Sequence, residues 1–170
     1  MQPQYVQEVD VLIAVVKWLL SEGWLIEHLS IPRGQGIDSI AAMKKVRAEL
    51  AGLNVEDGSV RYASKGEDIR ATKGGTLGGT LWKIECKGLG TEVRTPTVRN
   101  NFDRALASTV SYYDKPKGLR LGLALPEEYL KHVEGRLPRA LRTALNLWVF
   151  LYVKSENMVY TFAPDDTLSD

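Results

Sequence analysis

The stretch "LWKIECKG" at residues 81–88 combines a buried strand with charged side chains at its end. Successive side chains of a strand point to opposite faces, so Trp82, Ile84 and Cys86 share one apolar face. The other face begins apolar and ends charged, with Leu81, Lys83, Glu85 and Lys87 in order. This pattern predicts a strand that leaves the core at its last charged residues, where a cleft could open.

The segment before this strand supplies a second carboxylate. "EDIRAT" at residues 67–72 reads as a strand in which Ile69 alternates away from Asp68. The glycine-rich "KGGTLGGT" at 73–80 predicts a hairpin connection with a long loop. Backbones of paired strands lie about 4.8 Å apart, so carboxylates at neighbouring strand ends can converge on one cation.

These residue types suit a hard divalent cation. Mg²⁺ (or Mn²⁺) takes oxygen ligands and keeps several waters, and one or two protein carboxylates are typical of Mg²⁺. Asp68 and Glu85 are the candidate carboxylate ligands, and the backbone carbonyl of Cys86 is a candidate third oxygen. Lys87 is a compact charge that can orient the attacking water and hold a phosphate. The sequence therefore predicts a metal-dependent site that cleaves phosphodiester bonds, with Asp68, Glu85 and Lys87 as its catalytic residues.

Hydrophobic periodicity outlines the rest of the chain. Helices are expected over residues 4–21, 38–50, 97–113, 126–133 and 137–147, and further strands over 24–31, 60–62, 119–125, 148–154 and 158–163. On the third helix the expected buried stripe is Val98, Phe102, Leu106, Val110 and Tyr113. The order predicts an α/β domain with helices covering a mixed sheet. The acidic end, residues 163–170, is expected to fray.

Composition adds few constraints. The 170 residues carry a net charge of +1 and fit one domain with a sizeable core. The single cysteine, Cys86, excludes an internal disulfide and agrees with a reducing, cytoplasmic location. The apolar run at residues 11–20 contains Lys17 and is shorter than the roughly 20 residues a membrane span needs, so no membrane association is expected.

The order of these features resembles the PD-(D/E)xK nuclease superfamily. The features are Asp68 on one strand, a glycine-bearing turn, Glu85-x-Lys87 ending the next strand, an amphipathic helix and another strand. This group includes restriction endonucleases and archaeal-type Holliday junction resolvases. The resemblance covers about residues 5–125, as α-β-β-β-α-β with 32–66 as an insertion. Glu67 departs from it, because a proline stands before the aspartate in many members.

The resemblance implies a Mg²⁺-dependent endonuclease that hydrolyses DNA. The implied fold is α/β, with a restriction-endonuclease-like mixed sheet flanked by helices in one domain over residues 1–170. Its core spans about 5–125, with an inserted helix at about 38–51 and a C-terminal helix and hairpin at about 137–163. The resemblance also makes Glu8, on the first helix, a further candidate metal ligand. The candidate DNA-binding residues are Lys73, Arg94, Arg99, Asn100 and Arg104, and a homodimer would allow both strands to be cut.

Other interpretations fit the same residues. Glu85 and Lys87 also suit the solvated face of an edge strand, where charges oppose aggregation. The fold could serve as a non-catalytic module that binds nucleic acid or protein, or as a small-molecule binding domain with a coincidental motif. The aromatic residues of the terminal hairpin, Trp148 among them, are expected to pack in the core or at a subunit contact rather than to stack on bases.

Overall fold

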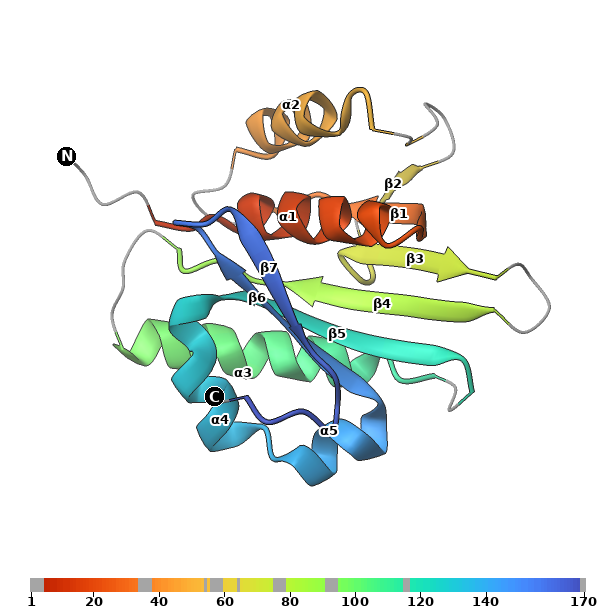
Figure 1. Cartoon of the computed structure of the whole chain (residues 1–170). Coiled ribbons are helices and arrows are strands. Elements are labelled where there is room, and N and C mark those ends of the chain that lie inside the picture. Colours follow the sequence, from red (N-terminus) through yellow and green to blue (C-terminus); the bar gives the residue numbers. More distant parts are fainter. Residues whose placement is uncertain are drawn as a thin grey trace.

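The computed structural model describes residues 5–33, 38–53, 55, 60–63, 65–74, 79–90, 95–114 and 117–168. They form a single α/β domain around a seven-stranded mixed sheet in the order β2-β1-β3-β4-β5-β6-β7 (Figure 1). The strands are β1 (Leu25–Ser30), β2 (Arg61–Ala63), β3 (Ile69–Lys73), β4 (Thr80–Cys86), β5 (Leu119–Pro126), β6 (Leu147–Val153) and β7 (Met158–Phe162). The predicted fold class, a mixed sheet flanked by helices, is confirmed.

Strand pairing follows the sequence patterns closely. β1, β3 and β4 pair antiparallel, β4, β5 and β6 pair parallel, and β6 and β7 close the sheet as the predicted terminal hairpin. The α-β-β-β-α-β order that the resemblance implies is present as α1-β1-β3-β4-α3-β5. Between β1 and β3 the chain forms α2 and then β2, and β2 extends the sheet parallel to β1.

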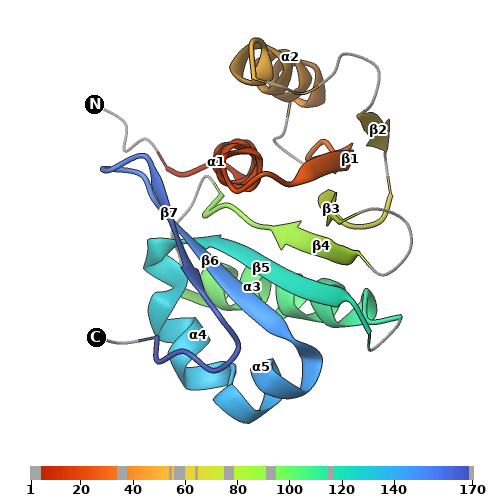
Figure 2. The same ribbon diagram turned by 45° about the vertical axis from the view of Figure 1, so that its right-hand side comes forward.

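Helices lie on both faces of the sheet (Figures 1 and 2). α1 packs on the face that carries Trp82 and Phe150, and α2 lies on the outer side of α1. α3 packs on the opposite face, against β4 and β5, with the later helices beside it. The helices are α1 (Glu8–Ser21), α2 (Ser39–Leu50), α3 (Thr95–Ser111), the 3₁₀ helix η1 (Glu127–Tyr129), α4 (Leu130–Arg136) and α5 (Arg139–Leu145).

Local signals fix several helix ends. Asp38 caps α2, because its Oδ1 accepts hydrogen bonds of 3.0 Å from the N–H groups of Ile40 and Ala41. Gly23 terminates α1 at φ +78°, a conformation that only glycine adopts readily, and its N–H donates to the carbonyl of Leu20. Both ends agree with the sequence prediction.

The predicted buried stripe of α3 is partly wrong. Val98 and Phe102 are buried as expected, but Val110 and Tyr113 are 38% and 39% exposed. The helix instead buries Ala105 and Thr109. The stripe that faces the sheet therefore continues from Ala105 and Thr109 to Tyr112 rather than to Tyr113. This orientation determines what the end of α3 contributes to the site.

The segment after β7 is more ordered than the acidic composition indicates. Arg142 on α5 is only 3% exposed, and its guanidinium donates to the carbonyls of Ala163 and Asp166. Leu168 is buried as well. The prediction that this segment frays is therefore wrong for the described residues up to 168.

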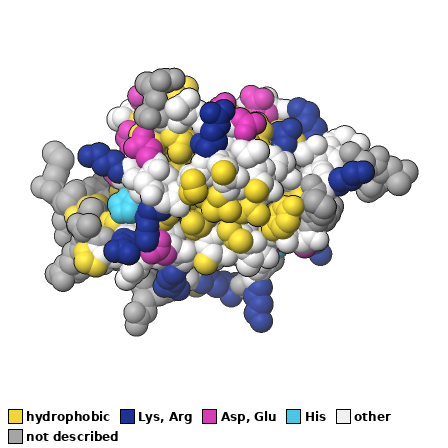
Figure 3. Space-filling view, turned by 90° about the horizontal axis from the view of Figure 1, so that it is seen from below, with side chains coloured by type: hydrophobic (Ala, Val, Ile, Leu, Met, Phe, Trp, Pro, Cys, Tyr) yellow, Lys and Arg dark blue, Asp and Glu magenta, His cyan; other side chains and the backbone are white. Residues whose placement is uncertain are grey.

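The face seen from below the view of Figure 1 carries apolar side chains across its middle, with lysine and arginine at its margins (Figure 3). Exposed apolar side chains on the helices of this side of the sheet include Val110 on α3 and Leu141 on α5. The homodimer therefore remains a prediction.

Among the described residues, no helix is both long and apolar enough to cross a membrane.

Candidate active site

The hairpin of β3 and β4 brings the two predicted carboxylates to the same end of the sheet. Asp68 directly precedes β3, whose first residue, Ile69, pairs with Ile84 on β4, so Asp68 lies beside Glu85. Asp68 Oδ2 accepts a 2.7 Å hydrogen bond from the backbone N–H of Cys86. This bond fixes the aspartate against the exit of β4, and both Asp68 and Glu85 are half-buried residues.

Lys87 and Glu8 meet at the same place. Lys87 Nζ lies 2.8 Å from Glu8 Oε2, with 30% of the lysine side chain and 15% of the glutamate side chain exposed. Glu8 is the first residue of α1, so the N-terminal turn of this helix faces the end of β4. Within this site, the structure gives Glu8 an ion pair with the lysine; its predicted role as a metal ligand stays a prediction.

Gly88 allows this close approach. A Cβ atom at position 88 would lie 2.4 Å from the backbone nitrogen of Glu8 and 2.8 Å from the carbonyl oxygen of Val6. The next residue, Leu89, donates its N–H to the same carbonyl at 2.9 Å. The backbone after β4 therefore packs directly on the start of α1, which a side chain at residue 88 would prevent.

Tyr112 completes the surroundings of Glu85, and the sequence analysis missed it. Its hydroxyl lies 2.5 Å from Glu85 Oε2 and 3.2 Å from the carbonyl oxygen of Gly66, and its single proton can be donated to only one of them. The shorter contact, to a charged acceptor, is the stronger hydrogen bond. Ser108, one turn earlier on α3, lies close enough to lower the pKa of Glu85. The spacing of these two residues, one helical turn, is the signal that could have indicated them.

Lys83, on β4, holds the segment that carries Tyr112. It is buried, and its ammonium lies 2.6 Å from Asp114 Oδ2 and 3.4 Å from the carbonyl oxygen of Tyr112. The lysine thus ties the segment after α3 to the middle of β4. It shares the face of Glu85, as the sequence predicts, but serves to hold Tyr112 in place.

Negative charge accumulates around Asp68 and Glu85. Burial, followed by the charge of Glu85, raises the pKa of Asp68 well above its ordinary value. Burial also raises the pKa of Glu85, the hydrogen bond from Tyr112 opposes this rise, and the charge of Glu8 adds to it. In the part of the chain that the structure describes, the ammonium of Lys87 lies near the carboxylates of Glu8, Asp68 and Glu85, so a divalent cation would balance the remaining charge. The donor set therefore fits Mg²⁺ or Mn²⁺.

The number of side-chain ligands is small. Within the part of the chain that the structure describes, no group of three or more His, Cys, Asp or Glu side chains is placed to hold a metal ion. Two carboxylates would need further oxygens from backbone, water or substrate, which is the pattern typical of Mg²⁺. The thiol of Cys86 is buried in the core and its burial raises its pKa, so only the backbone of this residue is a candidate ligand.

The structure places the predicted DNA-binding residues in different parts of the fold. Asn100 and Arg104 are exposed on α3 and precede Ser108 at intervals of four residues, so they continue the stripe that reaches Glu85. Arg99 is exposed on another side of the helix. Lys73 ends β3 at the opposite end of the sheet. Arg94 lies outside the described residues.

Comparison with known proteins adds little. No family model matches the chain, and no curated protein matches it. The chain is similar to the crystal structure, at 1.60 Å resolution, of an XisH family protein from Nostoc punctiforme PCC 73102. The identity is 13% and the TM-score 0.42, over 89% of this chain and 96% of that chain. Neither family nor function is assigned from this similarity.

The raised pKa values predict a pH-dependent stability. A carboxyl group whose pKa is raised in the folded state favours its protonated form there, so folding loses stability as the pH rises through that pKa. Without divalent ions, the wild type should be less stable at neutral than at mildly acidic pH. Asp68→Asn keeps the acceptor for Cys86 and should raise the neutral-pH Tm, by about 2–4 °C for each kcal/mol of repulsion removed.

Thermal unfolding in a chelator, followed by addition of Mn²⁺, measures both effects. Mn²⁺ is expected to raise the Tm of the wild type more than that of Asp68→Asn, because the variant lacks one of the two carboxylate charges that are predicted to bind the ion. Equal Tm values for the two proteins in chelator at neutral pH would contradict the predicted repulsion.

Proposed function

We propose that the chain is a Mg²⁺-dependent (or Mn²⁺-dependent) endonuclease that hydrolyses DNA phosphodiester bonds. The observation that carries this proposal is that Asp68, directly before β3, and Glu85, near the end of the paired strand β4, lie at the same end of the sheet as Lys87. Asp68, Glu85 and the carbonyl of Cys86 would hold the ion. When bound, the ion supplies a Lewis acid and lowers the pKa of water.

The chain's own residues position the remaining groups. Lys87 presents an ammonium beside the two carboxylates, where it can orient the attacking water and neutralise a phosphate oxygen. Glu8 holds this ammonium by the 2.8 Å ion pair, and Tyr112 hydrogen-bonds one oxygen of Glu85 and so limits the rotation of this carboxylate. Asn100 and Arg104, on the stripe that leads to Ser108, would contact the DNA backbone.

Cleavage assays test the proposal directly. Plasmid, linear and branched DNA are incubated with purified protein and Mg²⁺ or Mn²⁺, and the reaction is repeated in chelator. We expect cleavage that needs the metal and is lost in Asp68→Ala and Glu85→Gln. The matched control is Glu134→Gln, the same change at an exposed position of α4, which should cleave like the wild type. Metal-dependent cleavage that survives in Asp68→Ala would remove the assignment.

A non-catalytic module is the second candidate, and one observation favours it. Glu85 and Lys87 already have protein partners, Tyr112 and Glu8, as expected for charges that only stabilise a fold. Calorimetry with Mn²⁺ separates the two functions. Binding that disappears in Asp68→Asn supports the nuclease site, whereas no Mn²⁺ binding by the wild type supports the module.

A further inference from the structure

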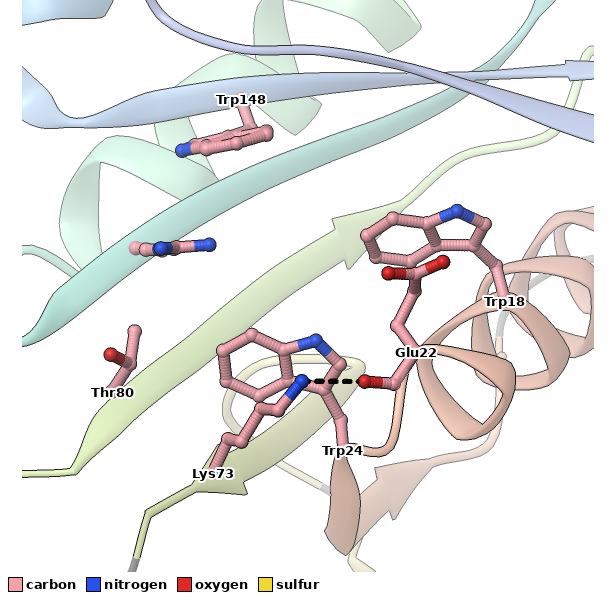
Figure 4. Close-up of a pocket in the computed structure, with 7 residues that line it drawn as sticks. Trp18, Glu22, Trp24, Lys73, Thr80 and Trp148 are labelled. Atoms are coloured by element: carbon pink, nitrogen blue, oxygen red, sulfur yellow. Dashed lines mark hydrogen bonds between the residues drawn. The ribbon is translucent and has the colours of Figure 1, made fainter.

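A pocket of about 360 Å³ opens on the α1 side of the sheet, away from the candidate active site. Its walls are Trp18, Trp24 and Trp148, and its charged groups are Glu22, Lys73 and Arg120 (Figure 4). Thr80, the first residue of β4, also lines it, whereas Glu85 lies near the other end of that strand. At a rise of about 3.3 Å per residue, these two residues are about 17 Å apart.

All four tryptophans of the chain gather around this pocket. Trp82 is fully buried beneath it, with its ring centroid 5.8 Å from that of Trp24 and 5.4 Å from that of Trp148. The rings come from α1, the start of β1, β4 and β6, so the fold assembles them from distant parts of the sequence. Figure 4 shows the indoles of Trp18, Trp24 and Trp148 spread around the open space.

Arg120 is an unusual cation within this aromatic group. Its guanidinium carbon lies 5.0 Å from the ring centroid of Trp148, 5.5 Å from that of Trp82 and 5.7 Å from that of Trp24. Among the described residues, no carboxylate or carbonyl group is hydrogen-bonded to it. Ring faces hold the guanidinium in place, while its N–H groups stay available to a ligand.

Lys73 provides a second cation beside it. Its ammonium lies 5.5 Å from the ring centroid of Trp24 and donates a 2.6 Å hydrogen bond to the carbonyl oxygen of Glu22 (Figure 4). An ammonium has three N–H groups, so two are left for an anion. With Lys73, Arg120 and the carboxylate of Glu22, the pocket carries a formal charge of +1.

The combination of aromatic rings and two cations limits which class of ligand fits the pocket. The two cations oppose a quaternary ammonium, which aromatic pockets otherwise bind. A neutral apolar ligand would bury their N–H groups without acceptors, which is unfavourable. An anion that also carries a flat ring satisfies both features, because bases stack on indole and guanidinium planes and phosphate oxygens accept from arginine and lysine.

We infer that this pocket binds a nucleotide, with the base against the tryptophans and the phosphate at Arg120 and Lys73. The volume lies at the lower end of the range for small-molecule pockets, roughly 300–1,000 Å³, so it suits one nucleotide rather than a duplex. The carboxylate of Glu22 offers an acceptor for a base amino group. The nucleotide is either free or part of a single strand.

Tryptophan fluorescence tests this inference on the full chain. Because every tryptophan belongs to this group, selective excitation of tryptophan reports on the pocket. Adenosine 5′-monophosphate should change the emission saturably in chelator, and adenosine or inorganic phosphate alone should bind at least about tenfold more weakly. The measurement needs neither a metal ion nor cleavage, so it can succeed or fail independently of the proposed nuclease activity.

Variants assign the binding to the pocket. Arg120→Gln should weaken binding of the nucleotide at least about tenfold, and Arg120→Lys should retain part of it. Arg139→Gln makes the same change on the exposed surface of α5, across the sheet, and should bind like the wild type. If Arg120→Gln does not fold by circular dichroism, Arg120→Lys and the wild-type ligand series decide the question.

Comparing the affinity of an oligoadenylate strand with that of the mononucleotide shows whether the pocket binds a single strand or a free nucleotide. Tighter binding of the strand with a steep salt dependence identifies a nucleic-acid single strand, and equal binding identifies a free nucleotide. Either result supports the inference. It is overturned by the absence of a saturable change with any of these probes, or by equal nucleotide affinity of folded Arg120→Gln and the wild type.

Discussion

Lys87→Met is expected to lower the rate of the proposed DNA cleavage by a factor of about 10²–10⁴, the range for the loss of a positioned catalytic group. The methionine keeps most of the side-chain volume but removes the ammonium beside Asp68 and Glu85. It also leaves Glu8 without its 2.8 Å ion-pair partner. Rates under single-turnover conditions, with the enzyme in excess over DNA and the metal ion saturating, measure the loss of the chemical step.

Lys131→Met is the matched control, because Lys131 is exposed on α4 and makes no contact with the site. It should cleave at the wild-type rate. Mn²⁺ binding by Lys87→Met should persist, since the carboxylates are unchanged, and calorimetry checks this. If Lys87→Met cleaves as fast as the control, the lysine has no part in the reaction and its ion pair with Glu8 is only structural.

Gly88→Ala is expected to destabilise the fold by about 1–3 kcal/mol or more, the usual cost of overpacking. The new Cβ would meet the backbone of Gln7 and Glu8 at 2.7 and 2.4 Å, and backbone atoms cannot rotate away as a side chain can. The start of α1 must therefore shift, and Glu8 with it. Denaturant unfolding measures the stability, and cleavage by the folded fraction should also fall.

Gly135→Ala provides the contrast. This glycine lies within α4, and a Cβ added there has no neighbour within 4 Å. Alanine favours helix over glycine, so this variant should gain about 0.5–1 kcal/mol in unfolding free energy. Equal effects of the two substitutions would show that the contact between Gly88 and α1 does not constrain the fold.

Much of the fold follows from local patterns in the sequence. The structure confirms β4, which the alternation in residues 81–88 predicts, and α1, which the helical spacing predicts. It also confirms the pairing of β3 with β4 that the glycine-rich stretch between them predicts. The pairing of Asp68 with Glu85 could be foreseen because the two residues lie at the open end of one hairpin. The side-by-side placement of β1 and β2, which are parallel, depends on a crossover through α2 that no local pattern indicates.

The missed features depend on packing between distant elements. Tyr112 continues the stripe of α3 that faces the sheet, which runs through Ala105 and Thr109 rather than through the most hydrophobic residues. Gly88 matters only because α1 packs against it. The tryptophan pocket is lined from α1, the segment before β1, β3, β4, β5 and β6, so Trp148 alone gave no reason to expect more than core packing.

The position of β5 in the sheet also has a consequence for protein synthesis. Lys87 donates its backbone N–H to the carbonyl of Ala124, at 2.9 Å, so the strand that carries Glu85 is held from one side by a segment made much later. Between residues 8 and 124, a ribosome adding about 5–20 residues per second needs roughly 6–23 s. A growing polypeptide would thus carry Glu8 for that time, and Asp68 and Glu85 for part of it, before β5 could hold β4, which would delay the proposed cleavage until the sheet has been translated through β5.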